Sequence, residues 1–304
     1  MTVALQRWLI AWLLATVAVA GWAAETRVLV VREDSAIARE AAKLLGGELA
    51  RQGWSSTEAI VAYERPVPDL RRDGEQTIVA LGSRAFVTAI RQTGGRSVVA
   101  ALITLSGLED LLPIAGERWS AIVLDQPAER WLNLIQTAMP GRQPVGMLVG
   151  PAGLKQARAM ERKLQDRRWS FAIESVASPE EVVPAIERLL PHIGLLLALP
   201  DPLAHNRNTV QPLLLTTYRA GIPVVAYSES YQQAGAVLAL YSTVPQIVAQ
   251  VMDTLRQFLE GRAPANVQLP RYFTVGINTA VARSLGLKLP SAAELAERLR
   301  SLDQ

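Results

Sequence analysis

The sequence predicts an α/β protein built as two doubly wound, Rossmann-like lobes joined by a multi-strand hinge. Three observations carry this prediction. Short, almost wholly apolar runs such as residues 77–82 alternate with longer helical segments, which indicates parallel strands covered by helices on both faces. The strands are too numerous for one comfortable open sheet. The strand–helix pattern also starts again near Pro144, after the break at Pro140 and Gly141.

The chain begins with a predicted secretory signal peptide over residues 1–24. Arg7 precedes an uninterrupted apolar stretch, small residues follow, and Glu25 is the first acid. This order is typical of signal peptides. Cleavage could follow Ala20, Ala23 or Ala24. The alternative is an uncleaved signal anchor, although the apolar run is at the short end of the roughly 17–25 residues that span a membrane. We expect the mature protein in a bacterial periplasm.

The elements of the first lobe follow in order. Residues 27–31 form a buried strand, and Ser35 is expected to cap the helix that ends near Arg51. Gly53 is expected to end this helix, and a second helix is expected to begin at Ser83. The remaining strands of this lobe are predicted at 55–63, 77–82, 98–104 and 120–125.

The second lobe repeats this alternation after a helix over 127–139. Strands are predicted at 144–150, 170–176, 193–200, 223–228 and 237–241, and helices at 153–168, 179–190, 208–220 and 244–261. Residues 266–278 are expected to be extended before turning helical. The resulting division places residues 25–125 and 244–264 in the N-terminal lobe and residues 126–243 and 265–304 in the C-terminal lobe, with crossings expected near 124–127 and 242–245.

Composition narrows the possible functions. The chain has no cysteine, and therefore no disulfide, thiol nucleophile or lipoprotein acceptor. Its net charge of +3 comes without basic runs, so we expect no nucleic-acid partner. His192 and His205, the only histidines, lie in different loops, and no P-loop, G-x-S-x-G or H-E-x-x-H motif is present. We expect neither enzyme activity nor a cofactor or metal, although catalysis by scattered residues stays open.

Several segments are similar to one known family. Residues 221–235 read GIPVVAYSESYQQAG, 260–264 read EGRAP, and 275–290 read VGINTAVARSLGLKLP; weaker matches are ALGSRA at 80–85, the segment 140–150 and LPDPLAHNRNT at 199–209. From about residue 27 to 290 the chain resembles ABC-type periplasmic substrate-binding proteins of the tryptophan/tyrosine type. The resemblance implies the type I periplasmic-binding-protein fold, with a hinge of several crossings.

The sequence departs from this family at two strand ends of the first lobe. Ser83, followed by Arg84, stands where the family usually has threonine. The family's Asp-Pro pair is replaced by Thr104, Leu105, Ser106 and Gly107. These departures leave the ligand undefined and keep open a divergent member that does not serve a transporter.

Candidate ligand residues of the first lobe follow its strands, because doubly wound sheets bind ligands at the carboxyl ends of their strands. Ser83 and the amides of the helix it opens could hold an anion such as a carboxylate, or Ser83 could simply cap the helix. Arg84 could pair with an anion or be a surface residue. Thr104 and Ser106 could contact ligand or only shape a turn. Glu33, after the first strand, is a weaker candidate on the same rim.

Candidates in the second lobe are mostly acidic or polar. Asp201 could receive a ligand ammonium or cap the turn before Pro202. Asn208 lies on the same loop and is expected to cap the next helix. Ser228 and Glu229 follow a strand where this fold aims side chains into the cleft, and Glu229 is the preferred acid.

These predictions favour a periplasmic solute-binding protein that captures a small polar or amino-acid-like ligand between its lobes for an ABC permease. The alternative is a sensory or accessory binding protein that reports to another inner-membrane partner, such as a sensor kinase. Neighbouring genes for a permease or for a kinase would discriminate between the two.

Overall fold

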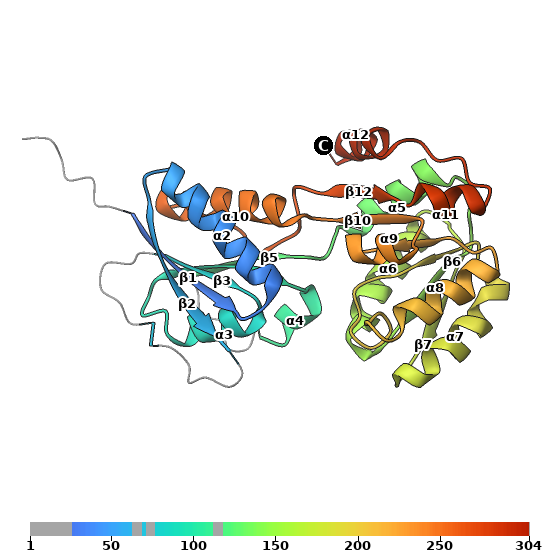
Figure 1. Cartoon of the computed structure of the whole chain (residues 1–304), viewed down its shortest axis with the longest axis horizontal. Coiled ribbons are helices and arrows are strands. Elements are labelled where there is room, and N and C mark those ends of the chain that lie inside the picture. The colour runs from blue at the N-terminus through green and yellow to red at the C-terminus, as the bar shows by residue number, and fades with distance from the viewer. Residues whose placement is uncertain (1–25, 63–68, 71–76, 112–117, 304) are drawn as a thin grey trace, which may run out of the picture.

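Two six-stranded sheets form the two lobes of the protein, which lie side by side in Figure 1. The computed structural model describes residues 26–62, 69–70, 77–111 and 118–303, so the predicted signal peptide lies outside the described residues. The α/β class and the two-lobed division of the strands are confirmed.

The first sheet has the order β11-β5-β4-β3-β1-β2, and all its pairs are parallel. Its strands are β1 (Arg27–Glu33), β2 (Ser55–Val61), β3 (Thr77–Leu81), β4 (Ser97–Ile103), β5 (Trp119–Val123) and β11 (Val267–Gln268). Helices α2 (Ala36–Arg51) and α10 (Val244–Leu259) cover one face, and α3 (Ser83–Arg91) and α4 (Leu105–Glu109) the other.

The second sheet has the order β12-β10-β9-β8-β6-β7, and only β12 runs antiparallel to its neighbour. Its strands are β6 (Val145–Val149), β7 (Phe171–Ser175), β8 (Leu195–Leu197), β9 (Val224–Ala226), β10 (Leu238–Tyr241) and β12 (Thr274–Ile277). One face packs on α5 (Ala128–Ala138), α6 (Leu154–Asp166), α11 (Thr279–Ser284) and α12 (Ala292–Leu302). The other packs on α7 (Val182–Leu189), α8 (Val210–Arg219) and α9 (Glu229–Ala234).

The apolar runs form strands for the reason expected from the sequence. Every residue of β3, β5 and β6 is buried, which a parallel sheet covered on both faces requires. Ser35 caps α2 as predicted, its hydroxyl accepting the Ala38 N–H at 3.3 Å. Strand and helix bounds otherwise fall within a few residues of the predicted ones.

Three chain segments cross between the lobes, and hydrogen bonds tie them together. They follow β5, β10 and β11. Gln126, on the first crossing, donates through Nε2 to Ser242 Oγ on the second at 3.0 Å. Ser242 Oγ in turn donates to the Tyr272 carbonyl on the third at 2.7 Å. The two crossings predicted near 124–127 and 242–245 are found, and the third, which the predicted division put at residue 265, lies a few residues later, after β11.

Arg130 of α5 fixes this hinge to the C-terminus. It is 5% exposed and stacks over the ring of Phe273, 4.2 Å from the centroid. Its Nη1 donates to the Pro270 carbonyl at 2.8 Å, and its Nε pairs with Asp303 Oδ2 at 2.6 Å. The end of α12 and the third crossing therefore share one buried guanidinium.

Three sequence predictions need correction. The second segment of the predicted C-terminal lobe began at residue 265, but β11 at Val267–Gln268 pairs with β5 in the first sheet. Two helices, α4 and α12, were not foreseen. Asn208 does not cap α8: Thr209 precedes that helix, and the Asn206 side chain accepts the N–H groups of Asn208 and Thr209 instead. Side-chain choice in such a polar turn depends on local geometry that composition does not encode.

Candidate functional site

A cavity of about 530 Å³ lies between the lobes, at the carboxyl ends of β4, β6, β8 and β9. The first lobe contributes the α4 segment, and the second contributes three loops. The lining residues are Thr104, Ser106, Gly107, Glu109, Asp110, Pro151, Ala152, Lys155, Pro200, Asp201, Pro202 and Tyr227. This edge of the two sheets is where doubly wound proteins bind ligands.

Thr104 and Ser106 line this cavity where β4 gives way to α4. Thr104 caps α4, its Oγ1 accepting the Gly107 N–H at 3.2 Å, and the two hydroxyl oxygens are 3.3 Å apart. The strand loses its regular pairing just before this point, and Leu102 adopts a φ of 60°. A non-glycine residue in this conformation costs of order 1–3 kcal/mol, and such strain clusters at ligand sites. These hydroxyl groups can therefore both shape the turn and contact a ligand.

Ser83 opens α3 on the same rim, but an acid of the chain itself occupies the helix start. Glu33 Oε1 accepts the Arg84 N–H at 2.8 Å. Gly82 has a φ of +106°, and a Cβ there would lie 2.4 Å from Glu33 Cδ, so only glycine admits this carboxylate. The Ser83 hydroxyl lies close to Gly107 of α4. The anion expected at α3 is thus supplied by Glu33.

Asp201 performs the corresponding task in the second lobe. The side chain follows β8, is 2% exposed and accepts four backbone N–H groups. Oδ2 accepts from Gly150 at 3.0 Å and Gly153 at 2.8 Å, and Oδ1 accepts from Leu203 at 2.9 Å and Ala204 at 2.8 Å. The carboxylate joins the loop after β8 to the turn after β6, which leaves little capacity for a ligand ammonium.

Tyr227 presents the aromatic surface of the cavity and was not singled out from the sequence. Its hydroxyl donates to the His205 carbonyl at 3.1 Å, and its ring packs edge-on against His205 and Tyr231. His205 Nε2 donates to the Leu148 carbonyl, and Nδ1 accepts from the Tyr231 hydroxyl, both at 3.1 Å. Burial lowers the pKa of His205 to about 4, with Asp201 opposing the shift. This imidazole is therefore a neutral structural group beneath the cavity floor.

The remaining predicted residues lie outside the cavity lining. Asn208 is exposed in the turn before α8. Ser228 caps α9, its hydroxyl accepting the Tyr231 N–H at 3.2 Å. Glu229 is exposed at the start of α9, close enough to Tyr241 to contribute to raising its pKa, after the larger effect of burial.

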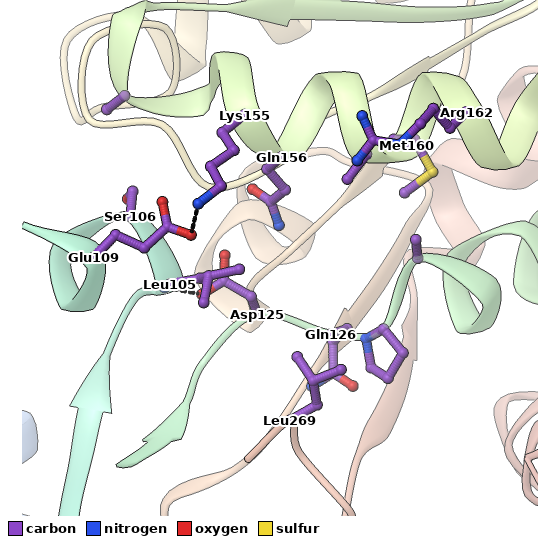
Figure 2. A pocket seen from close by; sticks show the side chains of 14 residues that line it. Leu105, Ser106, Glu109, Asp125, Gln126, Lys155, Gln156, Met160, Arg162 and Leu269 are labelled. Atoms are coloured by element: carbon purple, nitrogen blue, oxygen red, sulfur yellow. Dashed lines mark hydrogen bonds and ion pairs between the residues drawn. The ribbon is translucent and has the colours of Figure 1, made fainter. Parts of the chain in front are cut away.

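An ion pair joins the lobes across the cleft. Lys155 Nζ on α6 lies 2.5 Å from Glu109 Oε1 on α4, and Figure 2 shows the two side chains reaching toward each other. The pair connects residues 46 positions apart, so no local pattern could have revealed it. Lys155 is largely exposed, and such pairs contribute only about 0–1 kcal/mol.

The described part of the chain offers no group of three or more His, Asp or Glu side chains placed to hold a metal ion. Among the same residues, no helix has the length and hydrophobicity needed to cross a membrane.

Comparison with known proteins identifies the fold. No protein-family model and no curated protein matches the sequence. Among solved structures, a ligand-free, open substrate-binding protein with adhesive properties from Clostridium difficile matches with a TM-score of 0.73 at 14% identity, over 88% of this chain and 96% of that one. An ABC domain in complex with L-Trp from Streptococcus pneumonia matches with a TM-score of 0.64 at 15% identity, over 90% and 98%.

A periplasmic ribose ABC transporter structure from Conexibacter woesei also matches, with a TM-score of 0.57 at 13% identity, over 90% of this chain and 98% of that one. LacI-family transcriptional regulators are among the matching structures as well. The chain has the type I periplasmic-binding-protein fold. The resemblance drawn from residues 221–290 is confirmed at the level of fold.

Proposed function

We propose that the protein is an exported solute-binding protein that captures a small polar molecule between its two lobes. The observation that carries the proposal is the cavity of about 530 Å³, which both lobes line with residues from strand carboxyl ends. Solute-binding proteins whose structures share this fold support the same role. A ligand that contacts both lobes favours the closed arrangement over the open one, which gives a partner a state to recognise.

The ligand contacts that we propose come from both rims. Thr104, Ser106 and Ser83 supply hydroxyl groups from the first lobe. Tyr227 supplies a ring from the second, and Glu229, at the start of α9, supplies a carboxylate that reaches the ligand when the lobes close. Ser228 and Arg84 border this set. Asp201 acts by shaping the loop, because its carboxylate is already fully hydrogen-bonded.

The polar groups of the cleft favour a neutral or cationic ligand. The N–H of Arg84 on α3 is taken by Glu33, and those of Gly150 and Gly153 before α6 are taken by Asp201. A ligand carboxylate would have to displace one of these acids to reach the N–H groups. Hydroxyl and aromatic groups remain available, and they suit sugars, polyols and amines.

A thermal-shift screen tests this function. Binding to the native state adds RT ln(1+[L]/Kd), about 2.7 kcal/mol at a hundredfold excess over Kd, which should raise Tm by several degrees. We expect hits among neutral polyols or amines, and loss of the shift in a Ser106→Ala, Tyr227→Ala variant. A screen whose hits bind this variant unchanged would contradict the proposed site.

The second candidate function is that of a sensory or accessory binding protein. Transcriptional regulators with the same fold support this candidate. An ABC permease and a sensor kinase are distinguished by reconstituting the candidate encoded beside this gene in vesicles. Ligand-dependent stimulation of ATP hydrolysis supports transport, and ligand-dependent autophosphorylation supports signalling.

A further inference from the structure

A second cavity, of about 260 Å³, lies beside the hinge and beneath α6 (Figure 2). Its walls come from α4 of the first lobe, the first crossing over residues 125–128, α6 of the second lobe, and Leu269 on the third crossing. An occupant would therefore contact both lobes and two of the three crossings at once.

This hinge cavity adjoins the cleft and shares four lining residues with it, Ser106, Glu109, Ala152 and Lys155. Glu109 and Lys155 line both spaces, and their ion pair stands where the two meet. Asp201 and Tyr227 line only the cleft, whereas Met160 and Leu269 line only the hinge cavity. Each space therefore also has walls of its own.

The body of an occupant would meet mainly apolar surface. Leu105, Pro127, Met160 and Leu269 line the cavity, and Leu269 keeps 45% of its surface exposed. An apolar cavity of about 150 Å³ is enough to bind benzene. The hinge cavity therefore has room for a single ring or a short branched chain, whose burial would remove apolar surface from water.

Asp125 is the buried carboxylate among the polar and charged residues that line the cavity. Asp125 is 3% exposed, and its Oδ2 accepts the Leu105 N–H at 2.5 Å. Its own N–H and the Gln156 side chain also bond to it, and Figure 2 shows Gln156 reaching down from α6 toward Asp125. Burial nonetheless outweighs these bonds and, with Glu109 nearby, raises the pKa of Asp125. The negative charge is thus incompletely compensated.

A cation is the group that compensates such a charge best. The protein's own cations do not do so: Lys155 pairs with Glu109, and Arg162 lies along α6 near Met160, on the side of the cavity away from Glu109 (Figure 2). We propose that the hinge cavity is a second small-molecule site, which takes a compact amine with its apolar body under α6 and its ammonium group at Asp125.

Such an amine would stabilise the lobe spacing in which α4 and α6 both contact it, since a ligand favours the state that it binds better. The hinge site therefore gives a second molecule a means of biasing lobe closure. This inference stands independently of which solute the cleft binds.

Calorimetric titration of the protein with benzylamine, benzyl alcohol and benzoate tests the proposal. The three probes share one ring and differ in the charge of the attached group. We expect benzylamine to bind at millimolar concentration, benzyl alcohol about tenfold more weakly, and benzoate not at all, because a charged hydrogen bond is lost and then replaced by repulsion.

Two variants locate the site. Asp125→Asn should weaken benzylamine about tenfold while leaving benzyl alcohol unchanged. Ala159→Phe, which fills the cavity from α6, should abolish binding of both; Ala293→Phe, the same change at an exposed position of α12, should not. Melting temperatures verify that each variant folds, and Ala159→Phe decides the matter if Asp125→Asn does not fold. Undiminished benzylamine binding to Ala159→Phe, equal affinity for benzoate, or no binding of benzylamine would overturn the proposal.

Discussion

Replacing Asp201 by asparagine separates a structural from a ligand-binding role for this acid. The amide retains one oxygen, which can accept two of the four backbone N–H groups now held by the carboxylate. Its NH₂ group faces the other two donors and leaves them without a partner. Each hydrogen bond to a charged group contributes about 1.5–3 kcal/mol. Loss of two predicts a destabilisation of about 3–6 kcal/mol.

Scanning calorimetry measures this effect. For 150–250 residues a loss of 1 kcal/mol lowers Tm by about 2–4 °C, so Asp201→Asn should lower the transition of the second lobe by about 6 °C or more. Asp110→Asn makes the same chemical change at an exposed position of the same cavity. We expect it to alter stability by less than about 0.5 kcal/mol.

The result that would refute this reasoning is equal stability of the two variants. Asp201 would then contribute no more than an exposed acid, and its four N–H contacts would not explain its burial. If Asp201→Asn also lost affinity for a solute found by screening, that result would support the ammonium-binding role considered from the sequence.

Three further predictions follow from the same contacts. Gly82→Ala should cost at least about 2 kcal/mol in urea unfolding, because its Cβ meets the carboxyl group that caps α3; Gly95→Ala, also at positive φ but in open space, should cost less. Glu109→Gln should cost under about 1 kcal/mol and abolish the salt dependence of that contribution, which a double-mutant cycle with Lys155→Gln measures; a coupling energy well above about 1 kcal/mol, or one that added salt does not lower, would contradict this. His205 has a folded pKa of about 4 against about 6.5 unfolded, so its neutral burial stabilises the protein fully above pH 6.5 and loses about 2–3 kcal/mol by pH 4.5; a His205→Gln variant with the same acid sensitivity would contradict this.

The architecture was predictable because its signal is repeated and local. An apolar run of about five residues is readily buried as a strand that is covered on both faces. Strands β3, β5 and β6 are buried in this way. The restart near Pro144 marks the second lobe for the same reason. Helix α12 was missed although its capping box, Ser291 and Glu294, stands in the sequence.

The candidate site was less predictable because its contacts are non-local. Thr104, Ser106 and Asp201, which were selected by their position after a strand, line the cavity. This position did not reveal that the Asp201 carboxylate accepts hydrogen bonds from the N–H groups of Gly150 and Gly153, about 50 residues earlier. The residue type defines which hydrogen bonds a side chain can make. The folded backbone determines whether another group of the protein already makes them.

That competition bears on which solute the cleft can hold. Backbone N–H groups at a helix start normally attract a ligand's anionic group. In this chain Glu33 fills that position at α3, and Asp201 fills the turn before α6. Gly82, Gly150 and Gly153 each lack the Cβ that would collide with these acids, so the backbone itself is fitted to them. An anionic solute at either position would meet a carboxylate where it needs donors. For this reason we propose a neutral or cationic solute for the cleft rather than the carboxylate end of an amino acid.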